Sequence, residues 1–261
     1  MKKFISFYYG YESDYRHRIE IIKETGFDGV MALFRFSKSF YQECEEIQKS
    51  GLIIDSLHLP FRGIANKLWL SDKQSEVFIN EMKEGIDYAS SMNINKVTIH
   101  TSASKMPPPK RNVAIARIKS LCDYAYDKGI NVCIENLRRK DYFLYVSDNL
   151  NSVNAKICFD IGHMHAFWRG GLSSFAEEVD FSKIVCCHLH DNKGHFDSHL
   201  PPYKGTIHWS EACKHLSRMP LDGLTAEVFA NRRMRLRTDE KAYLSDINQS
   251  LSRIEKEIMC L

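Results

Sequence analysis

Eight short β-rich runs alternate with helical segments along the sequence, and this alternation limits the possible folds more than any other feature. Strands are expected at Lys3–Tyr8, Asp28–Phe34, Leu52–Leu59, Lys96–Thr101, Asn131–Asn136, Lys156–Ile161, Ile184–Leu189 and Leu224–Phe229. Strands that alternate with helices pair in parallel through right-handed crossovers, and eight such units are the number that closes a barrel. We therefore predict an α/β fold, a single-domain (β/α)8 TIM barrel over residues 1–261.

The segments between these runs carry helical patterns. Helices are expected at Tyr15–Thr25, Ser39–Lys49, Asp72–Met92, Arg111–Lys128, Ser174–Val179, Ser210–Arg218 and Thr238–Ile258, with a short connection at Leu144–Val153. The helical period is clearest in the third of these, where the apolar stripe consists of Val77, Ile79, Met82, Ile86 and Ala89. An open doubly wound sheet is the alternative, but no glycine-rich phosphate-binding motif follows the first strand.

Composition and charge narrow the class of protein. Hydrophobic residues make up 44% of the chain, which is enough for one large core, and no apolar run approaches the ~20 residues that span a bilayer. The cysteines lie in apolar or helical segments without any CxxC pair, so reduced thiols are expected. The protein is therefore expected to be soluble and cytoplasmic, with no membrane partner. A net charge of +3 decides little about nucleic-acid binding, because a dedicated binder usually shows a stronger or visibly segregated basic balance.

Imidazoles and carboxylates collect at the carboxyl ends of the last six expected strands: His58, His100, Glu135, Asp160 with His163, His188, and Glu227. In a TIM barrel these ends meet at the face that holds the active site. Each such group would cost several kcal/mol if it were buried without a partner. A divalent cation removes this cost, because it keeps carboxylates ionised and accepts imidazole lone pairs. The pattern therefore predicts a metal site.

Each of these residues also has an ordinary structural role open to it. A single strand-end histidine such as His58 is more often satisfied by backbone groups than by a metal. Asp160 could cap the following helix, and Glu135 could pair with a nearby arginine. Independent coincidences do not explain six such groups at six successive strand ends. Three further histidines are expected to lie outside the ligand set or in solvent: His165, His190 and His195.

Four strings resemble those of the xylose-isomerase-like TIM barrels and, within them, the sugar phosphate isomerase/epimerase group. They are IEN at 134–136, FDIGH at 159–163, HLHDNKGHFDSHLPPYKGTIHW at 188–209 and AEV at 226–228. The resemblance implies one divalent metal held by Glu135, Asp160, His188 and Glu227. It also implies substrate contacts from His163, His58, His100 and Lys193. Pro202-Tyr203-Lys204-Gly205 stands where the family has Pro-Gly, which leaves the shape of that loop open.

The apurinic endonucleases of the same superfamily resemble the same strings and are the alternative. Their trinuclear zinc pattern would use three ligand sets: His58, His100 and Glu135; Glu135, Asp160, His188 and Glu227; and His163, Asp197 and His199. Against this alternative, His100 is followed by Thr-Ser-Ala instead of Pro-Gly, and the chain lacks the basic bias that grips DNA. The isomerase or epimerase hypothesis is preferred, and nucleic acid stays an open partner.

The resemblance implies a reaction on a small sugar or sugar phosphate. Isomerisation and epimerisation remove a proton from the carbon beside a carbonyl, and a metal stabilises the resulting enediolate. Glu135 and Glu227 are the expected acid/base pair. Carboxylate and imidazole ligands suit Mn²⁺, Co²⁺, Mg²⁺ or Zn²⁺, and zinc is favoured if the additional histidines also bind. Cations for a phosphate are scattered over Arg35, Arg62, Lys105, Arg138 and Lys193. Barrels of this kind often form homodimers.

Overall fold

Eight parallel strands close on themselves in the computed structural model, which describes residues 1–261, and β1 pairs with both β2 and β8. The strands are β1 Lys2–Ser6, β2 Gly29–Leu33, β3 Ile53–His58, β4 Lys96–Ile99, β5 Asn131–Glu135, β6 Ala155–Asp160, β7 Ile184–Leu189 and β8 Gly223–Ala226. They follow one another around the barrel in sequence order, so every crossover joins neighbours. The predicted TIM barrel is confirmed.

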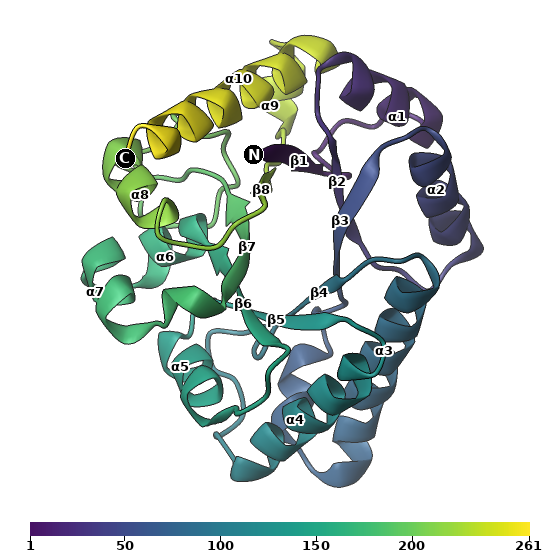
Figure 1. The fold of residues 1–261 in the computed structure, drawn as a ribbon, viewed down its shortest axis with the longest axis vertical. Helices are drawn as coiled ribbons and strands as arrows, with labels where there is room; N and C mark the ends of the chain where they lie inside the picture. Colours follow the sequence, from purple (N-terminus) through teal and green to yellow (C-terminus); the bar gives the residue numbers. More distant parts are fainter.

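Helices form the outer layer around this ring of strands (Figure 1). They are α1 Tyr15–Glu24, α2 Lys38–Lys49, α3 Asp72–Ser91, α4 Asn112–Tyr126, α5 Lys140–Asn149, α6 Ile161–Phe167, α7 Gly171–Glu178, α8 Trp209–Leu216, α9 Arg232–Arg235 and α10 Glu240–Met259, with 3₁₀ turns at Ala65–Trp69 and Phe181–Lys183. The C-terminal helix α10 contacts both α8 and α1 and so completes the ring. None of these helices is long and apolar enough to cross a membrane.

Several strands end earlier than the sequence predicts. β4 ends at Ile99 and β8 at Ala226, so His100 and Glu227 lie just beyond their strands. The ladder itself persists for one more residue at Glu227, whose N–H donates to the carbonyl of Leu189 at 3.1 Å. The reason is geometric. Neighbouring strands of a barrel are tilted and staggered, so at its rim only some of the strand hydrogen bonds still form.

Three helices of the structure were not predicted: α5, α6 and the short α9. A full helix, α5, begins at Lys140 where only a short connection at Leu144–Val153 was expected. The helix α6 starts directly after β6, and its N-cap is Asp160, whose Oδ1 accepts the N–H of His163 at 2.6 Å. The capping role considered for Asp160 is therefore confirmed, and this bond places His163 in the first turn of α6, next to the end of β6.

The buried face of α3 is rotated from the predicted stripe. The apolar residues that the helix buries are Phe78, Met82, Ile86 and Ala89. Val77, which the periodicity placed on this face, is 39% exposed. Adjacent helix positions differ by about 100° in direction, so burying the larger Phe78 turns Val77 outward.

The interior of the molecule is one large apolar cluster in which the thiols are reduced. Seven of the eight cysteines are buried and none forms a disulfide, as predicted. Three of them, Cys133, Cys158 and Cys186, form a separate small cluster on β5, β6 and β7. These thiols fill space on adjacent strands as small hydrophobic groups do.

A buried ion pair links β3 and β4. Nζ of Lys96 lies 2.7 Å from Oδ1 of Asp55 and 3.1 Å from Oδ1 of Asp222, and the side chains of Lys96 and Asp55 are each only 5% exposed. Burial lowers the pKa of Lys96, but the carboxylate of Asp55 more than offsets it, so the pKa lies above its ordinary value. Removing one partner would leave a buried charge uncompensated.

We expect Lys96→Met to lower the free energy of unfolding by about 3–5 kcal/mol, because it strands the Asp55 carboxylate in the protein interior. Urea denaturation followed by circular dichroism measures the change. The matched control is the double variant Lys96→Met/Asp55→Leu, which removes both charges and should recover most of the loss. A single variant that unfolds at the wild-type urea concentration would contradict this prediction.

Candidate metal centre

Four predicted ligands meet at the carboxyl ends of their strands. Glu135 ends β5, Asp160 ends β6, His188 lies in β7, and Glu227 follows β8. One ligand atom from each residue lies within 4.8 Å of the ligand atoms of the other three. Nδ1 of His188 is 3.3 Å from Oε2 of Glu227 and 3.6 Å from Oε2 of Glu135. The chain therefore brings three carboxylates and an imidazole to one point.

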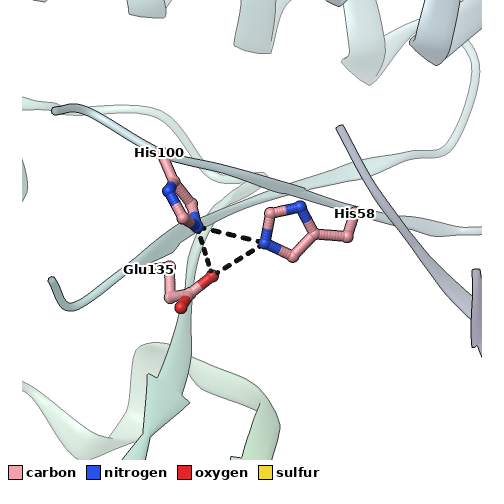
Figure 2. Close-up of side chains that lie close together, drawn as sticks. All are labelled: His58, His100 and Glu135. Carbon is pink, nitrogen blue, oxygen red and sulfur yellow. Dashed lines mark hydrogen bonds and ion pairs between the residues drawn. The ribbon is translucent and has the colours of Figure 1, made fainter. Parts of the chain in front are cut away.

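A second group contains His58 from β3, His100 after β4, and Glu135 (Figure 2). Nε2 of His58 and Nε2 of His100 lie 3.2 and 3.0 Å from Oε2 of Glu135, and 3.1 Å from each other. Figure 2 shows these three atoms pointing toward one another. Ligand atoms of a tetrahedral zinc site are separated by roughly 3.3–3.4 Å, so this triangle has about the size that such an ion needs.

A third group surrounds Asp197 in the loop after β7. Oδ2 of Asp197 lies 3.1 Å from Nε2 of His163 and 3.1 Å from Nε2 of His199. His199 has a φ of 44°, a left-handed conformation that is uncommon for residues other than glycine. Its carbonyl accepts the N–H of Phe229 at 2.9 Å, which helps to hold this conformation.

Two histidines direct Nε2 toward a carboxylate. Nδ1 of His58 lies 3.0 Å from the carbonyl of Leu59, and Nδ1 of His199 lies 2.8 Å from the carbonyl of Glu227. A carbonyl only accepts, so each Nδ1 carries the proton. In the neutral ring, Nε2 then holds a lone pair, and it faces Glu135 or Asp197. Histidine ligands of metals show this same arrangement.

Several buried polar atoms of the cluster make no hydrogen bond. They include both ring nitrogens of His188, Oε2 of Glu227 and Oδ1 of Asp197. Buried polar atoms are nearly always paired, so an unpaired group of this kind needs an explanation. A divalent cation supplies it, because carboxylate oxygens and imidazole nitrogens are suitable donors for such an ion. The residues therefore fit the predicted metal.

The carboxylates and imidazoles of the cluster shift one another's pKa values. Burial raises the pKa of Glu135, but the surrounding imidazoles, His100 and His188 foremost, lower it well below its ordinary value. Burial lowers the pKa of His199, but Asp197 and Glu227 raise it to about 10. The carboxylates are thus ionised and require nearby positive charge. Without a metal, protonated imidazoles provide this charge, and a bound cation replaces those protons.

Asn136 holds two of the ligands in register. Its Nδ2 donates to the carbonyl of Asp160 and its Oδ1 accepts the N–H of Asp160, each at 2.8 Å. This pair of bonds joins the ends of β5 and β6, which carry Glu135 and Asp160. No role was predicted for this asparagine, although it belongs to the IEN string.

Asp191 ties down the long loop after β7. Its Oδ1 accepts the N–H of Asn192 at 2.8 Å and of Ile207 at 3.2 Å, while Oδ2 accepts the indole N–H of Trp209 at 2.9 Å. Gly205 is needed here because a Cβ at that position would lie 2.1 Å from Oδ1 of Asp191. These contacts give Gly205 and Trp209 of the segment 188–209 a structural role.

A cavity of about 330 Å³ lies beside the cluster. The cluster residues His100, His163 and Asp197 line it, together with Phe61 and Phe167. A cavity of this size lies at the lower end of the range for small-molecule sites. His58, by contrast, is buried and does not line the cavity, and Lys193 is exposed and lies outside it.

A sequence model described as xylose isomerase-like TIM barrel matches residues 19–251. The chain belongs to this family. It is 24% identical over 219 residues to the uncharacterized protein MJ1311 of Methanocaldococcus jannaschii, which covers 77% of this chain and 73% of that protein.

Solved structures give the same fold. D-psicose 3-epimerase with D-tagatose, from Clostridium cellulolyticum H10, superposes with a TM-score of 0.81 at 14% identity and covers 99% of both chains. The IOLI protein with a binding zinc atom superposes with a TM-score of 0.77 at 16% identity, over 99% of this chain and 98% of that one. At these identities the likeness concerns the fold alone.

In this xylose isomerase-like barrel, His190 was expected either outside the ligand set or in solvent, and the structure excludes the second of these. The residue is fully buried, and its Nε2 lies 3.1 Å from Oδ1 of the predicted ligand Asp160. It also forms a possible ligand group with His199 and Glu227. Gly162 was a usable clue, because a Cβ there would lie 1.9 Å from the His190 ring.

Proposed function

We propose that this barrel is a divalent-metal-dependent isomerase or epimerase of a small sugar or sugar phosphate. The observation that carries the proposal is the placement of Glu135 and Glu227 at 3.6 and 3.3 Å from Nδ1 of His188, in a cluster whose neighbouring residues His163 and Asp197 line a cavity of about 330 Å³. Isomerisation and epimerisation need a carboxylate that can reach the carbon next to a carbonyl. The structural likeness to sugar epimerases supports the same class of reaction.

The residues of the chain have distinct roles in this scheme. Glu135 and Glu227 both have pKa values below their ordinary range, because nearby imidazoles outweigh the effect of burial, so both are in the ionised form that a general base needs. In isomerisation the group that takes the proton returns it to the neighbouring carbon, and in epimerisation a group on the opposite side delivers one. His163 lines the cavity and would orient a substrate oxygen.

The metal would be held by Glu135, Asp160, His188 and Glu227. A divalent cation there supplies Lewis acidity, which stabilises the negative charge left on the substrate oxygens after proton removal. This donor set suits Mn²⁺, Co²⁺, Mg²⁺ or Zn²⁺, and the zinc in the IOLI structure supports including zinc among them.

A second candidate is a phosphodiesterase with three metals, as in the apurinic endonucleases. The orientation of His58 and His199, each with Nε2 toward a carboxylate, favours it, because the neutral rings would provide ligands for two further ions. The small cavity favours a small substrate instead. The net charge of +3 also differs from that of a protein that neutralises many phosphates along a duplex.

Metal analysis together with two activity assays separates these candidates. We expect close to one tightly held metal per chain, exchange of the proton beside a ketose carbonyl in D₂O by NMR, and no cleavage of abasic-site DNA. The single-metal scheme does not need Asp197 as a ligand, whereas the three-metal scheme does. Metal content near three, with nicking of an abasic duplex that Asp197→Ala or His199→Ala abolishes, would reject the isomerase proposal.

A further inference from the structure

Two cationic side chains without partners line the cavity beside the metal centre. Lys105 lies in the loop between β4 and α4, and Arg138 lies in the loop between β5 and α5. Neither side chain forms an ion pair or a hydrogen bond, and both are exposed. The single acidic residue that lines the cavity, Asp197, already contacts His163 and His199. The side-chain charges of Lys105 and Arg138 therefore have no direct ionic partner in the cavity wall.

The surroundings of these cations leave them free to bind an anion. The guanidinium of Arg138 stacks over Phe167 with its Cζ 4.3 Å from the ring centroid, so its N–H edges stay available. The carbonyl of Lys105 accepts a hydrogen bond from Arg139 at 3.2 Å, which ties the two loops together. Oγ of Ser104 accepts the amide of Asn66 at 3.1 Å, so its own O–H can donate into the cavity.

We propose that Lys105 and Arg138 bind a phosphate monoester at the end of the substrate away from the reacting carbons, so that the substrate is a sugar phosphate. This inference rests on the proposed function. A phosphate monoester carries a charge of about −1.5 to −2 and three acceptor oxygens. Two cations and a hydroxyl complement this charge and this number of acceptors better than they complement a carboxylate, which has one charge and two oxygens. Arg35, another cation that was considered for a phosphate, differs from these two because it already forms an ion pair with Glu43 at 2.7 Å.

The test measures equilibrium binding to the metal-loaded protein by calorimetry. The probes are fructose, fructose 6-phosphate and fructuronate, which differ at one terminal carbon. We expect fructose 6-phosphate to bind at least about 10-fold more tightly than fructose, since hydrogen bonds to charged groups contribute about this much each. The double variant Lys105→Gln/Arg138→Gln should lose this advantage and keep the metal content and the fructose affinity of the wild type. Arg233→Gln, an exposed arginine in α9, is the matched control and should change nothing.

Three results would overturn the inference. The first is equal binding of fructose and fructose 6-phosphate by the wild type. The second is a preference for the phosphate that survives the double variant, which would place the phosphate on the metal instead. The third is fructuronate binding as tightly as fructose 6-phosphate, which would indicate a carboxylate site. Failure of the proposed function is seen separately, as phosphate binding through these residues without proton exchange on any ketose.

Discussion

Glu227→Gln is expected to reduce turnover by at least about 10²-fold while the barrel and its metal content persist. Glutamine keeps one oxygen for the metal but loses the carboxylate that takes or returns the proton. It also removes a negative charge 3.3 Å from Nδ1 of His188 without changing the volume of the side chain. The measurement is the rate of solvent deuterium exchange at the carbon beside the carbonyl of a ketose substrate, followed by NMR.

The matched control for this variant is Glu211→Gln, which makes the same change at an exposed position of α8. It should leave the exchange rate unchanged. Wild-type exchange in Glu227→Gln would reject the role of Glu227. Absence of exchange in the wild type on every ketose and ketose phosphate would instead contradict the proposed function.

Removing the metal with a chelator is expected to lower the melting temperature by about 8–16 °C. A ligand at about 1,000 times its dissociation constant stabilises the folded state by about 4 kcal/mol, and each kcal/mol shifts the melting temperature of a chain of this size by about 2–4 °C. The physical source is the group of carboxylates at Glu135, Asp160 and Glu227, the first two of them fully buried, which needs positive charge. Calorimetric scans with and without the chelator, followed by re-addition of Mn²⁺ or Zn²⁺, measure the effect.

Asp160→Ala tests whether this stabilisation comes from the proposed centre. The variant should lose both the bound metal and the response to the chelator, because it removes a ligand from the four-residue group. Asp123→Ala, an exposed aspartate on α4, is the matched control and should respond as the wild type does. A wild-type protein that binds no metal and melts at the same temperature with and without the chelator would remove the metal hypothesis.

Local patterns were enough to predict the barrel and much of its site. The alternation of strand and helix is visible residue by residue, and parallel strand ends meet at one face as a consequence of the topology. His58, Glu135 and His188 could therefore be assigned to a common cluster from their positions at strand ends alone, and the structure brings both histidines into ligand groups that share Glu135. The same reasoning left two positions open for His190, one beside the ligands and one in solvent, because it follows the strand and no local pattern indicates that it packs against Gly162 of α6.

The sequence by itself determined the fold, the reduced thiols and the donor types at the carboxyl ends of the strands. Only the tertiary structure decided which loops meet. Asn136 bonds to Asp160, and Asp191 accepts a hydrogen bond from Trp209 across the loop after β7. Lys105 and Arg138 line the same cavity, whereas Lys193 lies outside it. The physical reason is the distance along the chain over which each signal acts. Hydrophobic periodicity reports the direction of each side chain relative to its own backbone, whereas contacts between loops depend on how closely separate chain segments approach after the barrel has closed.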